Sequence, residues 1–211
     1  MDFNLTEERG LLRDMLQKFL GEKYGHEERR KLIASGKAYD AGIYAEMAEL
    51  GVLGAMFSEE DGGLGGAGFD IAVVFEELGR AGVIEPILGN AVLAGSLIAD
   101  LGSDSQKELI GSVIAGETLL AFAHTEPASR YDLNHVTASA KTDGGQITLN
   151  GTKAHVLNGA QAGMLVVSAR EAGADWDETG ISLFLVPSGA KGVTIVDHPN
   201  VDGTSAATIR L

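Results

Sequence analysis

The feature that most constrains the fold is a change in hydrophobic period near Glu117. Before it, apolar residues recur every three or four positions, as in amphipathic helices; after it, short runs alternate as in β-strands. We therefore expect an α+β chain with an all-α domain over residues 1–117 and an antiparallel β domain over residues 118–211. With 211 residues, 45% of them hydrophobic, the chain is long enough to build both cores.

The helical half shows start signals and apolar faces. Thr6 is expected to cap the first helix, because its hydroxyl can accept a hydrogen bond from a first-turn amide. The apolar face that recurs from Leu11 to Leu20 is predicted to be buried. Other helices are predicted over Ile43–Leu50, Asp70–Leu78 and Ala91–Leu101, and one that ends near Ala115 after a capping box of Ser105 and Glu108.

The second half contains short runs rich in β-formers. They are Leu119–His124, Val136–Lys141, Gln146–Leu149, Ala154–Leu157, Met164–Ala169, Ile181–Val186, a run starting at Gly192–Val196, and Ala206–Leu211. Asp143-Gly-Gly145 and Asn150-Gly151 separate three of these runs. Asn-Gly between alternating segments is a strong hairpin signal, so both positions are predicted to be hairpin turns.

Composition excludes several classes of function. Sixteen Lys and Arg against thirty Asp and Glu give a net charge of -14, which disfavours nucleic acid as a partner. The absence of cysteine excludes disulfides and thiolate metal sites. No basic leader precedes an apolar stretch and no apolar run reaches membrane-spanning length, so we expect a cytoplasmic protein with no membrane partner.

Two further patterns favour structural roles. The glycine-rich segment Glu59–Gly66 lacks the Gly-Lys-Ser/Thr ending of a phosphate-binding loop, so we predict a tight inter-helix turn whose glycines adopt positive φ. The β half carries four histidines, none in a close pair at metal-ligand spacing, and packing roles are favoured over a metal. They are His124, His135, His155 and His198.

The segment Leu119-Leu-Ala-Phe-Ala-His-Thr-Glu-Pro127 is the best candidate for a ligand site. It reads as a strand that leaves a core and presents the Thr125 hydroxyl, with Pro127 ending the ladder. Thr125 is either a strand-end cap or a contact to a flat ligand with a polar edge. Arg130 either forms a surface ion pair with Asp132 or faces a pyrophosphate or carboxylate.

Several segments, taken in order, resemble the N-terminal and middle domains of the acyl-CoA dehydrogenases. They are Leu5-Thr-Glu-Glu8, Glu60-Asp-Gly-Gly63, Phe75-Glu-Glu-Leu-Gly-Arg80, Ala121-Phe-Ala-His-Thr-Glu-Pro127, Leu149-Asn-Gly-Thr-Lys153, Val156-Leu-Asn158 and Ile181-Ser-Leu-Phe-Leu-Val-Pro187. The variant Pro127-Ala-Ser-Arg-Tyr-Asp-Leu133 is most similar to the small subunits of the pimeloyl-CoA branch. The resemblance implies a helical domain followed by an antiparallel β-barrel or sandwich.

The resemblance also implies FAD as cofactor and an acyl-CoA as substrate. In the family a glutamate removes the α-proton of the thioester while a hydride passes from the β-carbon to the flavin, and an electron-transfer acceptor reoxidises it. The positions that match flavin contacts of the family are Phe122, His124, Thr125, His155, Val156 and Leu157.

Some positions depart from the family pattern. Arg130-Tyr131-Asp132 replaces the usual Gly-Ser-Asp, so Arg130 and Tyr131 become the candidates for substrate contact. His155-Val156-Leu157 replaces Trp-Ile-Thr, which removes an indole face and a hydroxyl, and flavin packing should differ accordingly.

The family continues into a second helical bundle that carries the catalytic glutamate in most branches and much of the oligomer interface. No catalytic residue is therefore assigned in this chain, which alone is expected to be inactive and to form a homo- or hetero-oligomer. Three functions remain open: a FAD-dependent dehydrogenase, with a dicarboxylyl-CoA among its candidate substrates; a non-catalytic binding or scaffolding subunit of a heteromer; and an acyl-CoA oxidase.

Overall fold

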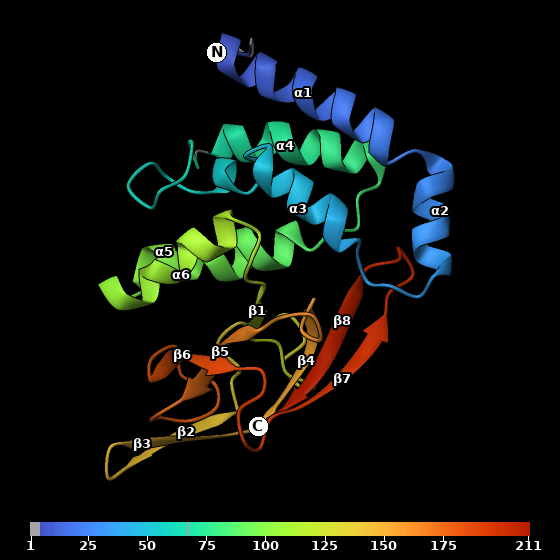
Figure 1. Ribbon diagram of the computed structural model, residues 1–211. Coiled ribbons are helices and arrows are strands. Elements are labelled where there is room, and N and C mark those ends of the chain that lie inside the picture. The colour runs from blue at the N-terminus through green and yellow to red at the C-terminus, as the bar shows by residue number, and fades with distance from the viewer. Residues whose placement is uncertain (1–4, 67) are drawn as a thin grey trace. The chain divides into compact units, whose positions relative to one another are not determined.

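The computed structural model describes residues 5–66 and 68–211, and it divides the chain into two compact units (Figure 1). One unit extends to Ile87 and resumes over Ser96–Glu117, and the other combines Leu88–Gly95 with Thr118–Leu211. The first is helical and the second is built on β-strands, which confirms the predicted α+β class.

The helical unit is a set of helices joined by short turns. They are α1 (Glu7–Lys23), α2 (His26–Ala34), α3 (Ala41–Glu49), the 3-10 turn η1 (Gly54–Met56), α4 (Gly68–Ala81), α5 (Ser96–Leu101) and α6 (Asp104–Ile114). Thr6 caps α1 as predicted, since its hydroxyl accepts from the Arg9 amide at 3.4 Å. Leu16 and Leu20 are buried, but Leu11 is 65% exposed, so the buried face of α1 is narrower than predicted.

The capping box of α6 lies two residues before its predicted position. The N-cap is Ser103, and its backbone N–H donates to Gln106 Oε1 at 2.8 Å. Ser103 has an extended backbone, with φ -66° and ψ 162°, whereas Ser105 already lies inside the helix and cannot be a cap. The prediction of Ser105 with Glu108 was therefore wrong, because the same Ser-x-x-acceptor pattern occurs twice in this stretch.

The glycine-rich segment between η1 and α4 is a tight turn, as predicted. Gly62 and Gly66 adopt φ of 84° and 70°, which L residues with side chains rarely adopt. Gly63 is needed for a different reason, since a Cβ there would lie 2.2 Å from the Phe57 carbonyl oxygen. The glycines thus allow the chain to fold back against the end of η1.

The β unit contains two sheets. Its strands are β1 (Leu120–Ala123), β2 (Ser139–Asp143), β3 (Gln146–Asn150), β4 (Thr152–Leu157), β5 (Met164–Arg170), β6 (Ile181–Pro187), β7 (Thr194–Pro199) and β8 (Ser205–Arg210). One sheet has the order β1-β5-β2-β3 with β6 also paired to β5, and the other has the order β4-β8-β7 (Figure 1). A core between them includes Ala121, Val156, Leu165 and Ile209.

Two sheets around a common core confirm the sandwich alternative of the prediction. They do not close as a barrel, and the pairing is not wholly antiparallel, because β5 pairs in parallel with both β1 and β2. The Asp143-Gly-Gly145 turn does join an antiparallel hairpin, β2 with β3, as predicted.

The second predicted hairpin does not form. After Asn150-Gly151 the chain crosses into the other sheet, where β4 pairs with β8. Gly151 N and O both bond to Leu211, and a Cβ on Gly151 would lie 2.5 Å from that of Ala138. The prediction was wrong because this glycine serves close packing and strand crossover.

Residues predicted as the start of a helix over Ala91–Leu101 belong to the β unit. They form a π-helix, η2 (Leu88–Gly95), before α5 begins at Ser96. The buried Asn90 accepts from the Leu120 amide at 2.8 Å through its Oδ1. Gly89 packs so closely on Asn158 that a Cβ would lie 1.8 Å from Oδ1, so this helix is joined to β1 and β4.

Candidate functional site

The two segments predicted to contact a flavin lie next to each other. The Ala154 amide in β4 donates to the Thr125 carbonyl at 2.8 Å, just beyond the end of β1. The side chains of Thr125 and His155 are both exposed on these neighbouring segments. The structure therefore brings together two parts of a candidate site that are 30 residues apart in the chain.

Phe122 and His124 form a flat pair on the β1 side. Their rings stack with centroids 5.3 Å apart and an interplanar angle of 12°. Both side chains are half-buried, so part of each ring can contact a ligand. A stack of this kind also restricts ring rotation.

His155 is held in an unusual backbone conformation. Its φ is 52°, in the left-handed region that few residues other than glycine adopt. The cause is a shift in the pairing of β4 with β8 between Lys153 and Val156, which inserts a bulge at Ala154 and His155. Bulges re-aim side chains, and this one leaves the imidazole in solvent.

Of the remaining predicted flavin contacts, Val156 points into the core and Leu157 is half-buried. Val156 can therefore reach a ligand only through its backbone. Both predicted substrate-contact residues, Arg130 and Tyr131, are exposed, Tyr131 to 98%. Arg130 has a φ of 50°, and within the described part of the chain it forms no ion pair with Asp132.

A buried ion pair beside these residues was missed in the sequence. Lys153 is 0% exposed, and its Nζ lies 2.7 Å from Glu126 Oε1. Glu126 also accepts from the Thr137 hydroxyl and from the amides of Thr137 and Ala138. Neither residue carries a signal of burial, because Lys153 lies in a short strand after a turn and Glu126 lies just before a proline.

The electrostatics of the pair are set by competing effects. Burial acts to raise the pKa of Glu126, but hydrogen bonds from Lys153, Thr137 and Ala138 outweigh it and lower the pKa. Burial lowers the pKa of Lys153, and the bond and charge of Glu126 partly oppose that change. The carboxylate form of Glu126 is thus the one that the fold stabilises.

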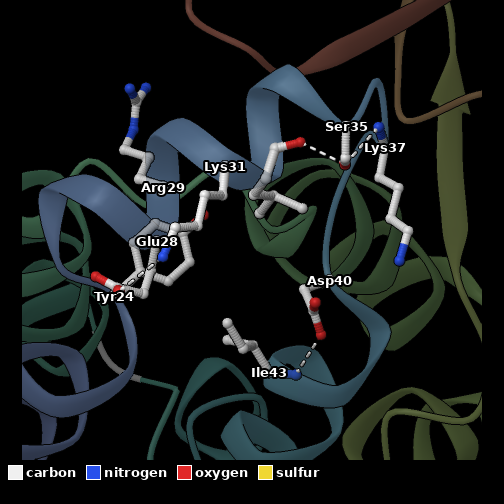
Figure 2. Close-up of a pocket in the computed structure, with 9 residues that line it drawn as sticks. Tyr24, Glu28, Arg29, Lys31, Ser35, Lys37, Asp40 and Ile43 are labelled. Atoms are coloured by element: carbon white, nitrogen blue, oxygen red, sulfur yellow. Dashed lines mark hydrogen bonds and ion pairs between the residues drawn. The ribbon is translucent and has the colours of Figure 1, made fainter.

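The helical unit contains a separate open pocket of about 240 Å3, and none of the predicted site residues lines it. Figure 2 shows its polar groups in local hydrogen bonds, with Asp40 Oδ1 accepting from the Ile43 amide at 3.1 Å. Asp40 caps α3, and Ser35 Oγ donates to the Leu32 carbonyl at 2.6 Å. These bonds stabilise helix ends. Lys31 and Lys37 at the pocket are exposed, and Arg29 is half-buried, with its Nε donating to the Gly82 carbonyl at 2.6 Å.

The described residues provide neither a cluster of metal ligands nor a membrane-spanning helix. Within 5–66 and 68–211, no group of three or more His, Asp or Glu side chains is arranged to hold a metal ion. Among the helices formed by these residues, none has the length and apolar character needed to cross a membrane.

Comparison with known proteins identifies both halves of the chain. Residues 6–117 match the acyl-CoA dehydrogenase N-terminal domain, and residues 121–211 match the acyl-CoA dehydrogenase middle domain. The chain is 33% identical over 208 residues to a short-chain specific acyl-CoA dehydrogenase of Megasphaera elsdenii, covering 92% of this chain and 52% of the relative.

Solved structures agree in fold over nearly the whole chain. Butyryl-CoA dehydrogenase from Megasphaera elsdenii has a TM-score of 0.86 and 28% identity, covering 100% of this chain and 57% of that one. A variant of the Tcur3481-Tcur3483 steroid ACAD has a TM-score of 0.85 and 28% identity, covering 97% and 55%. The chain spans about half the length of the curated relatives that it matches, 52% in the case of the Megasphaera elsdenii relative.

Proposed function

The chain belongs to the acyl-CoA dehydrogenase family, and from this premise we propose that it forms the helical and middle domains of a FAD-dependent enzyme. The reaction would be the α,β-desaturation of an acyl-CoA thioester. A cytoplasmic location, an electron-transfer acceptor and an oligomeric assembly are parts of the same proposal.

One observation carries the proposal: the hydrogen bond from the Ala154 amide to the Thr125 carbonyl sets the two candidate flavin-contacting segments edge to edge. Around this bond lie an exposed hydroxyl on Thr125, an exposed imidazole on His155 and the stacked rings of Phe122 and His124. A flat ring system with a polar edge needs such a set of aromatic faces and fixed polar groups, so these residues fit a flavin.

The roles of the chain's own residues follow from their chemistry. Phe122 and His124 would hold the flavin through their ring faces, and the Thr125 hydroxyl and the backbone of Val156 and Leu157 would hold its polar atoms. FAD, when bound, supplies the acceptor for the hydride that leaves the β-carbon. No acid in this chain is assigned as the base that removes the α-proton.

The substrate contacts are proposed on the loop after Pro127. Arg130 is an exposed cation in a chain of net charge -14, which suits an anionic partner such as a CoA phosphate or the distal carboxylate of a dicarboxylyl-CoA. The neighbouring Tyr131 offers a hydroxyl to the same partner.

The test is a FAD titration of the chain and of Thr125→Val, followed by flavin absorbance and fluorescence. We expect the variant to bind FAD about fivefold more weakly, the effect of one lost hydrogen bond of about 1 kcal/mol. Thr148→Val, at an exposed position on β3, is the matched control and should leave affinity unchanged. Equal loss in both variants, or no loss in Thr125→Val, would contradict the assignment of Thr125.

A second candidate is a non-catalytic subunit that contributes part of a flavin site to a heteromer. It is favoured by a structural neighbour whose name joins two components, Tcur3481 and Tcur3483. This candidate predicts weak FAD binding by the chain alone and acyl-CoA-dependent dye reduction only after a partner is added. Dye reduction by the chain alone would reject it.

A further inference from the structure

His124 is connected to the buried ion pair through one serine. His124 Nδ1 lies 2.9 Å from Ser168 Oγ, and Ser168 Oγ lies 3.1 Å from Lys153 Nζ. Lys153 Nζ also lies 3.1 Å from the His124 carbonyl and 2.7 Å from Glu126 Oε1. Ser168 is 1% exposed and Lys153 is 0% exposed, so water does not compete for these groups.

Counting protons assigns a direction to each bond. An ammonium group has three donors and no acceptor, and Lys153 has three acceptors: Glu126, the His124 carbonyl and Ser168 Oγ. Ser168 Oγ must therefore accept from Lys153, which leaves its own proton for His124 Nδ1. A buried hydroxyl proton without an acceptor would be costly, so Nδ1 is the acceptor and the ring proton lies on Nε2.

The surroundings favour the same form of the imidazole. Burial lowers the pKa of His124, and the positive charge of Lys153 lowers it further. Two smaller effects oppose them, the charge of Glu126 and a hydrogen bond with the Leu133 backbone. The stacking on Phe122 fixes the plane of the His124 ring. The hydrogen bond from Ser168 fixes which ring nitrogen carries the proton.

We propose that Lys153, anchored by Glu126, acts through Ser168 as a positioning residue that fixes the His124 ring with Nδ1 as acceptor beside Thr125. The inference rests on the proposed function in one respect: the fixed imidazole is a preformed contact for the flavin. Preorganisation of this kind strengthens binding because the ring loses little freedom when the ligand arrives.

The experiment is nitrogen-15 NMR of the histidine-labelled 211-residue chain without flavin, with the His124 signals assigned by their loss in His124→Gln. Long-range proton–nitrogen couplings identify which ring nitrogen carries the proton. In the unmodified chain we expect His124 to show Nε2–H alone, and to stay neutral below the pH at which an exposed histidine titrates. A protonated Nδ1 at neutral pH would overturn the inference.

Variants of Ser168 separate positioning from general stability. Ser168→Ala should give His124 a mixture of ring forms and a higher pKa, whereas Ser168→Thr, which keeps the hydroxyl, should restore the single form. Ser205→Ala is the matched control, because Ser205 is a buried serine of the same unit whose hydroxyl bonds to Asp197 and not to His124. A His124 spectrum unchanged by Ser168→Ala would reject the relay through this hydroxyl.

A FAD titration of the same variants distinguishes the two proposals. If Ser168→Ala weakens FAD binding about fivefold, as expected for one contact of about 1 kcal/mol, both proposals stand. If the NMR result holds but the unmodified chain binds no FAD even with a partner, the proposed function fails and the positioning of His124 stands. If FAD binds to the unmodified chain and to Ser168→Ala with the same affinity, the positioning of His124 does not contribute to flavin binding.

Discussion

At the scale of single residues, the buried pair of Lys153 and Glu126 is the group whose loss should cost most. We expect Lys153→Met to lower the unfolding free energy by about 3–5 kcal/mol at neutral pH, because it leaves the Glu126 carboxylate buried without its cation. Urea unfolding measures this, with Lys141→Met on an exposed position of β2 as control. The double variant Lys153→Met with Glu126→Gln should recover part of the loss.

The pair of Lys153 and Glu126 also predicts that the unfolding free energy depends on pH. The folded-state pKa of Glu126 is lowered, so its stabilising effect is present above the ordinary glutamate pKa and is lost as pH falls through the lowered value. In Lys153→Met, burial should instead raise that pKa, and the carboxyl can become neutral. The stability gap between the two proteins should therefore shrink towards acid pH; a gap that is constant with pH would contradict the ion pair.

Residue-level selection from sequence was limited to what a single short segment shows. Thr125 was selected because its hydroxyl lies at a strand end, and His124 because its position matches a flavin contact of the family; both stay predictions. Glu126, Lys153 and Ser168 could not, since each is ordinary in its own segment and their connection appears only when β1, β4 and β5 come together. Pairing across strands is not encoded in any short window.

At the scale of elements, Gly151 and Gly144 should respond differently to alanine. Gly151→Ala places a Cβ 2.5 Å from the Ala138 Cβ and should cost about 1–3 kcal/mol, the usual effect of overpacking. Gly144→Ala at the β2–β3 turn has no atom within 4 Å and only the strain of a φ of 55°, about 1–2 kcal/mol. Adding Ala138→Gly should recover part of the loss in Gly151→Ala, because it removes the Cβ contact and leaves the Cα of residue 138 at 2.7 Å, and it should recover nothing in Gly144→Ala. Thermal unfolding distinguishes them, and rescue of both or of neither would contradict the packing explanation.

The helices and strands show which sequence patterns predicted the structure correctly. The hydrophobic period gave the correct helix and strand type for most segments, and Asp143-Gly-Gly145 gave a correct hairpin. Asn150-Gly151 did not, because the following strand buries Lys153 and Val156 against β8 in the other sheet. The parallel pairing of β1 with β5 was also missed, since strand direction depends on contacts far apart in sequence.

At the scale of the whole molecule, the sequence division at residue 117 and the compact units differ in one segment. Residues 88–95 cluster with the strands, although they lie between stretches of the helical unit. Family matching places its boundary near 117 because it follows chain order, whereas packing follows contacts. A β unit made only of residues 118–211 would lack the Asn90 side chain that accepts from the Leu120 amide.

This arrangement gives the last prediction. Asn90→Ala should lower the stability of the β unit by about 1–3 kcal/mol, because the Leu120 amide is left buried without an acceptor. Trp176 is the sole tryptophan and stacks on His135 within this unit at 3.9 Å, so its fluorescence during urea unfolding reports on the unit directly. Asn150→Ala, at an exposed position at the end of β3, is the control and should leave the transition unchanged.

A fragment of residues 118–211 should unfold at a lower urea concentration than the full chain, as measured by the same Trp176 fluorescence. If neither Asn90→Ala nor the fragment shifts the Trp176 transition, residues 88–95 do not contribute to the stability of the β unit. The β unit would then begin after residue 117, at the boundary given by chain order.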